Sequence, residues 1–404
     1  MDSARKTTCL GRVASFVLND HRYVLLGTSV VALIGMLLSS SPRSQMSFLA
    51  HYYTLELVMY YLLVLWLVIS LAGLVVKLLH WKNYAEVSPF ARTGVRHALR
   101  IGSYVVWAIT LVLFIDRVVM GFVAAWVEAT TATSRPDNAL ASTLYMVWQG
   151  RDIFARGAMT TVGLALFGTI IAFVLAILLV FCRVQQIDRP DNDLTRFLKV
   201  VGGGFARFYS TVVRGTPMMV QGCIIYYGVF NLLRATTLSV TQINGIWTTF
   251  IAGLVTISLN SCAYMMEVLR GGIESVDPGQ AEAARSLGLS QWQAMSKVVF
   301  PQGIKNAIPG LSNELVVNIK DSSVLSVIGT FDLMFASRTV AGIYYQNFQA
   351  NLVAAVVYLM LTLIASHLLG ILARRLDVRP QPLMSTSDMP MPTAASQTAE
   401  EGRA

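Results

Sequence analysis

Long apolar stretches separated by short polar segments dominate this chain. Eight of them approach the roughly 20 apolar residues that a helix needs to cross the hydrocarbon core of a bilayer. They lie near residues 23–39, 55–76, 102–127, 158–182, 216–233, 247–268, 307–329 and 351–373. Because helices satisfy their own backbone hydrogen bonds in lipid, the pattern predicts an all-α polytopic membrane protein with about eight transmembrane helices.

Basic residues indicate the direction in which these helices cross the membrane. Five segments, at residues 1–22, 77–100, 183–214, 270–305 and 374–404, hold 23 Lys and Arg residues, whereas the alternate segments hold six. Cytoplasmic segments carry the excess of Lys and Arg in membrane proteins. We therefore expect a multi-pass inner-membrane protein with both termini, and the segment 270–305, in the cytoplasm.

The spans and connections predict three regions. Residues 1–157 contain three spans and end in a polar external loop, predicted over residues 128–157. Residues 158–373 contain five spans with short connections. Residues 374–404 are rich in Pro, Ser and Thr, which predicts a disordered cytoplasmic tail.

Composition agrees with a bilayer environment. Of the 404 residues 55% are hydrophobic and 13% charged, with a mean hydropathy of +0.58, which is more apolar surface than a soluble core of this length hides. The net charge of +9 follows the topology of the spans, so we expect no nucleic-acid partner. The four cysteines lack metal-site spacing, and we expect free thiols and no metal.

Capping residues predict two short helices within the segment 270–305. Asp277 is a suitable N-cap, and Pro278 suits a first helical turn. Gly288 tolerates the left-handed conformation that ends many helices, and Ser290 can cap a second helix. Helices of about ten residues are marginal alone in water, so we expect this pair to pack against a partner protein. A loop of two solvated helices is the alternative.

The first of these helices offers small side chains for close approach to a groove in another protein: Ala281, Ala283 and Ala284. Glu282 and Arg285 are candidate charged anchors on the same helix. Pro301 is expected to end the second helix, since proline cannot continue a helical hydrogen-bond ladder.

The segment 270–305 contains Glu282-Ala283-Ala284, then three residues and Gly288, and then nine residues before the sequence VVFP at 298–301. This order resembles the EAA signature of ABC-importer permeases. Val298 and Phe300 replace the usual Ile and Leu, and the spacing matches in full. The resemblance implies that this loop docks onto a separate cytoplasmic ATPase. It implies a coupling role for Glu282, Ala283, Ala284, Arg285, Gly288 and Pro301.

Three further segments carry the same resemblance. Residues 214–221, with the sequence RGTPMMVQ, are similar to the RGTPLLVQ stretch of the polar amino-acid branch. Tyr264, Glu267 and the run RGGI at 270–273 are similar to its AY..E..RGGI pattern, and residues 320–329 to its K-(D/E)-(T/S)-S-L-x-S-V-I-G pattern. The resemblance implies a five-helix permease core for histidine, glutamate, glutamine, arginine or opines over residues 158–373, preceded by three extra spans.

The resemblance also implies a set of partners. They are a cytoplasmic ABC ATPase dimer that binds ATP and Mg, an extracytoplasmic solute-binding protein, and a second copy or a homologous permease. An amino-acid substrate and the lipid bilayer complete the set. The sequence has no G-x-x-x-x-G-K-[ST] loop, which an ATP-binding motor needs. We therefore expect no cofactor, no catalytic residue and no enzymatic activity in this chain.

Polar side chains interrupt the seventh apolar stretch. Glu314, Asn318 and Asp321 are spaced i, i+4 and i+7, and so share one helix face, while Asn313 and Lys320 lie on a second face about 100° away. Such groups can pair with the ammonium and carboxylate of an amino acid. Candidate substrate-path residues are Glu314, Asn318, Lys320, Asp321, Ser322 and Ser323. Neutralisation of charges on neighbouring spans is the alternative.

Two other classes of protein are alternatives to an ABC permease. A secondary transporter could use Lys320 and Asp321 as an intramembrane relay, and a membrane-embedded enzyme would need a reactive group that no motif provides. Asp116 and Arg117, in the middle of the third stretch, are interpreted as structural contacts between spans, because buried charges in membranes are usually paired.

Overall fold

All regular elements that the structure describes are helical, which confirms the predicted fold class. The computed structural model describes most of the chain: residues 21–80, 89–185, 187 and 191–375. The disordered tail predicted over residues 374–404 lies almost entirely outside these residues. Close contacts divide the chain into two compact units, Met1–Trp148 and Gln149–Ala404.

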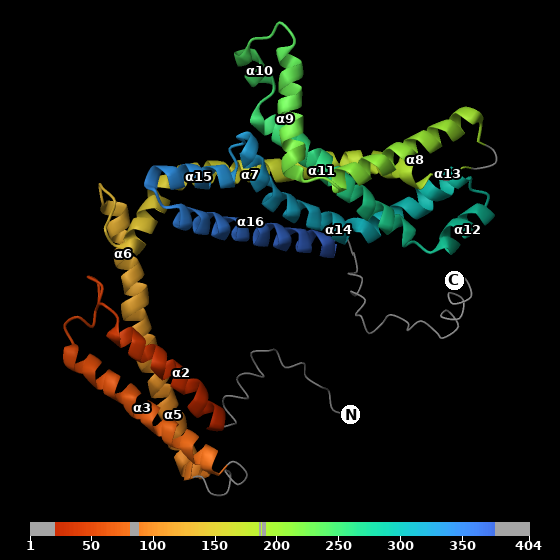
Figure 1. Cartoon of the computed structure of the whole chain (residues 1–404). Helices are drawn as coiled ribbons and strands as arrows, with labels where there is room; N and C mark the ends of the chain where they lie inside the picture. Colours follow the sequence, from red (N-terminus) through yellow and green to blue (C-terminus); the bar gives the residue numbers. More distant parts are fainter. Residues whose placement is uncertain (1–20, 81–88, 186, 188–190, 376–404) are drawn as a thin grey trace, which may run out of the picture. The chain divides into compact units, whose positions relative to one another are not determined.

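Unit 1 is a small helical module with its own apolar core (Figure 1). Its elements are α2 (His21–Ser40), α3 (Tyr53–Leu79), η1 (Pro89–Ala91), α5 (Thr93–Phe114), η2 (Ile115–Val119), α6 (Met120–Thr131) and the first residues of α7 (Ala139–Val184). Leu63 of α3 and Leu113 of α5 are fully buried in one cluster with Ala32 of α2. Packing among these three helices therefore forms the module.

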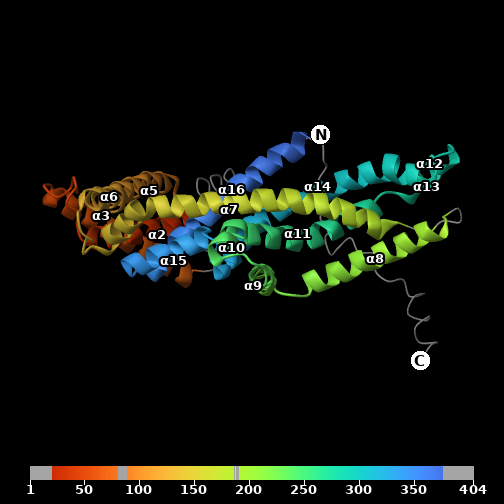
Figure 2. The same cartoon turned by 90° about the horizontal axis from the view of Figure 1, so that it is seen from above.

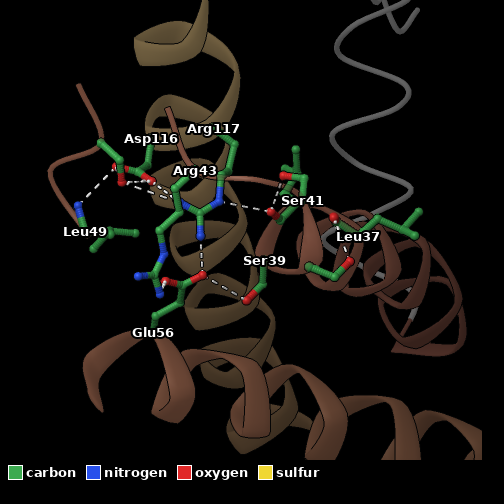
Figure 3. A network of polar contacts seen from close by, with 11 residues as sticks. Leu37, Ser39, Ser41, Arg43, Leu49, Glu56, Asp116 and Arg117 are labelled. Atoms are coloured by element: carbon green, nitrogen blue, oxygen red, sulfur yellow. Dashed lines mark hydrogen bonds and ion pairs between the residues drawn. The ribbon is translucent and has the colours of Figure 1, made fainter. Parts of the chain in front are cut away.

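A buried network of charges connects the helices of unit 1 (Figure 3). Asp116 accepts hydrogen bonds from Ser47 Oγ at 2.8 Å and from the backbone N–H of Leu49 at 3.1 Å, both in the loop between α2 and α3. Arg117 pairs with Asp116 at 2.6 Å and with Glu56 of α3. Both residues lie in η2, a single π-helical turn. The predicted role of Asp116 and Arg117 as contacts between spans is confirmed.

The network balances its charges within the apolar interior. Arg43 forms the second ion pair of Glu56, at 2.7 Å, and Arg117 Nε also donates to the carbonyl of Leu38 at the end of α2. Asp116 is fully buried and Arg117 is 8% exposed. Charges removed from water are costly unless they are paired and hydrogen-bonded, and here both carboxylates meet a guanidinium.

Unit 2 contains the remaining helices. They are the rest of α7, α8 (Asp193–Arg214), α9 (Met218–Arg234), α10 (Val240–Ile246), α11 (Thr249–Glu274), α12 (Pro278–Ser286), α13 (Gln291–Ala294), η3 (Met295–Val299), α14 (Phe300–Asp321), η4 (Ser322–Ile328), α15 (Leu333–Tyr344) and α16 (Asn347–Arg375). Figures 1 and 2 both place α12 and α13 together at one end of this unit, beyond α11 and α14.

Small and apolar side chains pack α7, α8, α11 and α14 together. Ala176 of α7, Ala206 of α8, Met266 of α11 and Ala307 of α14 belong to one buried cluster. Alanine lets helix backbones approach closely, which is the usual way helices associate in membranes. Cys262 of α11 is part of the same cluster, and Cys182, Cys223 and Cys262 are free thiols as predicted, while Cys9 lies outside the described residues.

Each of the eight predicted stretches is helical over most of its length, although the helices differ in how well they suit a membrane. Within the part of the chain that the structure describes, five helices are long and apolar enough to cross one: Tyr53–Val76, Thr93–Thr131, Ala139–Val184, Thr249–Glu274 and Asn347–Ala373. A sixth span is possible if Gln291–Ile328 and Leu333–Tyr344, which meet at a bend of 55°, act together. The predicted seventh stretch therefore lies in the first helix of this bent pair, where α14 continues as the 3₁₀ turns of η4 and ends before Gly329, whose φ is +82°.

The predicted external loop over residues 128–157 is wrong in extent. Helix α6 continues to Thr131 and α7 begins at Ala139, so only a short connection is non-helical. Trp126 and Trp148 pack edge to face across this connection, with ring centroids 5.8 Å apart. Arg135 Nε donates to Ser142 Oγ at 2.8 Å. The polar composition of this segment suits a solvated helix as well as a loop, and periodicity does not distinguish them.

The buried network of unit 1 predicts unequal effects for its two arginines. Arg117→Met leaves two buried carboxylates without their shared cation, and we expect a loss of about 3–5 kcal/mol of stability. Arg43→Met removes an arginine whose side chain is 34% exposed, so about 1 kcal/mol or less is expected. Thermal unfolding of the detergent-purified variants measures both, and equal melting temperatures would contradict a buried anchor at Arg117.

Candidate functional site

The segment between α11 and α14 forms a capped helical hairpin, as its sequence predicts. Asp277 Oδ1 accepts from the backbone N–H of Gly279 at 2.8 Å and begins α12. At the other end, Gly288 has φ +88°. Its N–H donates to the carbonyl of Arg285 at 2.9 Å, and the N–H of Leu289 donates to the carbonyl of Ala284 at 3.2 Å. This is the Schellman arrangement that ends helices at a left-handed residue.

The second helix begins with a reciprocal cap and is longer than predicted. Ser290 Oγ accepts from the N–H of Gln293 at 3.2 Å, and Gln293 Oε1 accepts from the N–H of Ser290 at 2.9 Å. Helix α13 then continues through the π-helical turn η3 into α14. Pro301 therefore does not end the second helix, contrary to our prediction. It lies in the first turn of α14, where a missing N–H is tolerated.

The surface that α12 presents differs from the predicted small-residue face. Ala284 is 4% exposed and Ala281 packs against the buried cluster of unit 2, so both face the rest of the chain. The exposed side chains of α12 and its C-cap include Glu282, Ala283, Arg285 and Leu287. Leu287 is 85% exposed, and the sequence reasoning missed it. An apolar side chain directly before a positive-φ glycine is the signal that could have identified it.

Aromatic side chains attach this hairpin to the end of α7. The ring of Phe181 stacks on Phe300 with centroids 4.3 Å apart and contacts Trp292 of α13 at 5.8 Å. Trp292 is nonetheless 55% exposed. The hairpin thus has a buried inner side, and its outer side carries charges and two large apolar side chains.

A close crossing of α11 and α14 forms the base of the hairpin. A Cβ built on Gly272 would lie 2.5 Å from the carbonyl oxygen of Gly303 and 2.8 Å from Cβ of Ala307. Asn306 Nδ2 also donates to Ser275 Oγ at 2.9 Å across the two helices. The motif RGGI contains two glycines. Gly272 is required by this backbone contact, whereas Gly271 faces open space.

The segment RGTPMMVQ forms the corner between α8 and α9 and contacts α11. The guanidinium of Arg214 lies over the ring of Tyr264, 5.6 Å from its centroid. Gln221 Nε2 donates to the carbonyl of Val213 at 2.7 Å, and its Oε1 accepts from Asn260 Nδ2 at 2.9 Å. Residues of segments that lie far apart along the chain thus meet at one corner of unit 2.

The six candidate substrate-path residues do not form one cluster. Asn318 is buried, accepts from Ser261 Oγ at 2.6 Å and donates to Thr169 Oγ1 at 2.8 Å. Ser322 is fully buried and donates to Thr161 Oγ1 of α7 at 3.4 Å as well as to the carbonyl of Ile319. These two residues therefore connect helices. The other four keep accessible surface: Lys320 is exposed, and Glu314, Asp321 and Ser323 are half-buried. In the described part of the chain, no group of three metal-type ligands occurs.

Comparisons with known proteins identify the class to which this arrangement belongs. The family described as "Binding-protein-dependent transport system inner membrane component" matches residues 194–380. A putative glutamine transport system permease protein from Rickettsia bellii (strain RML369-C) is 35% identical over 223 residues, which cover 55% of this chain and 92% of that protein. An arginine transport system permease protein from Bacillus subtilis (strain 168) is 33% identical over 55% of this chain and 91% of its own length.

A solved structure, described as that of an amino acid ABC transporter with histidines, shares 34% sequence identity. The match covers 57% of this chain and 97% of that one, with a TM-score of 0.48. The relatives in sequence leave nearly half of this chain unmatched.

The chain belongs to the family of binding-protein-dependent transport system inner membrane components, which are the permease subunits of ABC importers. It is a multi-pass inner-membrane transport subunit. In this family a separate ATPase hydrolyses ATP, and a substrate-binding protein is a further partner. The family implies no cofactor on the permease. The predicted class is confirmed, and a secondary transporter is not favoured.

The crossing of α11 and α14 predicts opposite outcomes for two adjacent glycines. Gly272→Ala introduces a methyl group against the backbone of Gly303, so we expect a loss of about 1–3 kcal/mol of stability. Gly271→Ala occupies open space in a helix and should be neutral or stabilising by up to about 1 kcal/mol. Melting temperatures of the two purified variants measure the difference. Equal values would show that α11 and α14 do not approach at Gly272.

Proposed function

We propose that this chain forms the translocation path for polar amino acids in an ATP-driven importer. Relatives named as glutamine and arginine permeases support this substrate class. So do the charged side chains on α14, because Glu314, Lys320 and Asp321 provide both signs of charge. An amino acid carries an ammonium and a carboxylate, and charged partners of both signs recognise such a molecule well.

The outer side of α12 is the proposed docking surface for the ATPase. The observation that carries this proposal is the exposure of Glu282, Arg285 and Leu287 on a short helix whose ends are both capped. A short helix with charged residues around one large apolar side chain fits a groove in a partner protein. The partner is an ATPase dimer that binds ATP and Mg, and each permease copy would use one groove.

The remaining parts of the proposed assembly follow from charge and sequence. Residues 158–373 act as the permease domain, paired with a second copy or a homologous permease, and receive substrate from an extracytoplasmic solute-binding protein. Residues 1–157 are an accessory region outside the family core. Both termini lie in the cytoplasm, since the basic segments fall on that side.

Affinity purification of the tagged full-length chain from its native membrane tests the assembly. We expect a P-loop ATPase and a solute-binding protein among the captured proteins, and ATP hydrolysis only when the ATPase is present. In proteoliposomes, amino-acid uptake should require ATP inside and the loaded binding protein outside. Uptake driven by an ion gradient without the ATPase would overturn the proposal.

The hinge at Gly288 should be essential for coupling to the ATPase. Gly288→Val places a β-branched residue at φ +88°, which costs about 1–2 kcal/mol at this position. We expect the angle between α12 and α13 to change, and the yield of co-purified ATPase and the rate of uptake to fall by about tenfold.

Gly288→Asn is the matched control, because asparagine adopts the left-handed conformation more readily than other residues. It should keep most of the activity. Glu282→Lys should weaken ATPase binding to a smaller degree than Gly288→Val, because it reverses one exposed charge and leaves the backbone unchanged. Wild-type uptake by a well-expressed Gly288→Val protein contradicts the docking role.

Two substitutions on α14 test the substrate path. Glu314→Gln and Lys320→Met each remove one charge, and we expect the apparent KM for amino-acid uptake to rise by about tenfold while ATPase assembly persists. Lys305→Met, at an exposed lysine on the same helix, is the control and should leave KM unchanged. If all three variants transport with wild-type kinetics at equal expression, these charges have no substrate role.

A further inference from the structure

The cytoplasmic ends of three helices meet at one carboxylate, that of Glu267 in α11. Ser210 of α8 donates to Glu267 Oε1 at 3.1 Å. Arg270, one turn further along α11, donates through Nε to Glu267 Oε2 at 2.8 Å. Arg183, the penultimate residue of α7, lies with Nη2 3.7 Å from Glu267 Oε1. One side chain, 16% exposed, is therefore shared by α7, α8 and α11.

The same network continues to the base of the coupling hairpin. Arg270 Nη1 pairs with Glu274 Oε2 at 2.5 Å, at the last residue of α11. The next residue, Ser275, accepts a hydrogen bond from Asn306 of α14. A displacement of α12 therefore acts first on the end of α11, which is the element that carries Glu267.

The two cations of Glu267 are engaged unequally. Arg270 makes a hydrogen bond of ordinary length, whereas the 3.7 Å contact with Arg183 is an ion pair too long for a hydrogen bond. Arg183 Nη1 is buried and has no hydrogen-bond partner. A buried donor without a partner is costly, so Arg183 is the cation of this network with unused capacity for a closer contact with a carboxylate.

Apolar contacts elsewhere in this interface give no such directional preference. Ala176 and Val180 of α7 and Met265 and Leu269 of α11 belong to one buried apolar cluster, and apolar packing is non-directional. The carboxylate of Glu267 is therefore the contact that depends most strongly on the rotation of α11 relative to α7 and α8.

We propose that Glu267 is the positioning residue that transmits movement of the ATPase-docked hairpin to α7 and α8. The inference rests on the proposed coupling role of α12. In this arrangement Arg270 connects Glu267 to the hairpin, and Arg183 receives the movement on the side of α7. Glu267 contacts neither ATP nor the transported molecule.

The test uses the complete importer in proteoliposomes, with ATP hydrolysis and amino-acid uptake measured together. Glu267→Gln keeps the shape of the side chain and removes its charge. We expect the complex to assemble in normal amounts, while uptake per ATP hydrolysed falls by about tenfold, a usual scale for coupling between sites. Asp152→Asn, which removes the charge of an exposed carboxylate on α7 outside this network, is the matched control and should stay within about twofold of wild type.

Arg183→Gln tests the same role of Glu267 if the Glu267→Gln protein does not fold. Arg183→Gln removes the loosely engaged cation, so it should fold normally and show the same loss of uptake per ATP. Glu267→Asp, which keeps the charge, should recover part of the coupling. Wild-type coupling in both Glu267→Gln and Arg183→Gln overturns this inference alone, whereas failure of the wild-type chain to assemble with an ATPase overturns the proposed function itself.

Discussion

The backbone contact between Gly272 and Gly303 is the constraint on which the hairpin of α12 and α13 depends. Two helices that cross without side chains between them can approach more closely than any pair of larger residues allows. The crossing fixes the ends of α11 and α14, and the capped hairpin of α12 and α13 extends from those ends. Its exposed side chains are therefore held by a rigid base, although the hairpin helices are too short to be stable alone.

Polar residues inside the apolar helices serve two different purposes. Asn318 and Ser322 satisfy their hydrogen bonds within the chain and connect α14 to α7 and α11. Glu314, Lys320 and Asp321 keep accessible surface on the same run of helix. In a medium without water an unsatisfied polar group is costly, so the residues that retain exposure are the better candidates for contact with a transported molecule.

The buried charges of unit 1 are paired within unit 1 itself. Its π-helical turn places Asp116 and Arg117 so that they pair with each other and also reach α2, α3 and the loop between them. Adjacent residues on a regular helix point about 100° apart, and the extra residue of a π-turn changes that geometry. A region outside the family core thus has its own polar anchor in addition to its own apolar core.

The number of apolar stretches that are long and apolar enough to cross a membrane did not follow from the sequence, which predicted eight where the described residues contain five or six. The sequence alone did predict the class of protein through its motifs, the helical character of those stretches, the caps at Asp277 and Ser290, and the left-handed end at Gly288. These features are local, because apolar length, capping chemistry and positive φ depend on a few neighbouring residues. The sequence did not determine that Ala284 faces inward, that Asn318 connects three helices, or that Pro301 lies within a continuous helical run. Helix α8 and the bend before α15 were also missed. Those features depend on which helices meet in space, and contacts between residues 50 to 150 positions apart leave no periodic signal in a single chain.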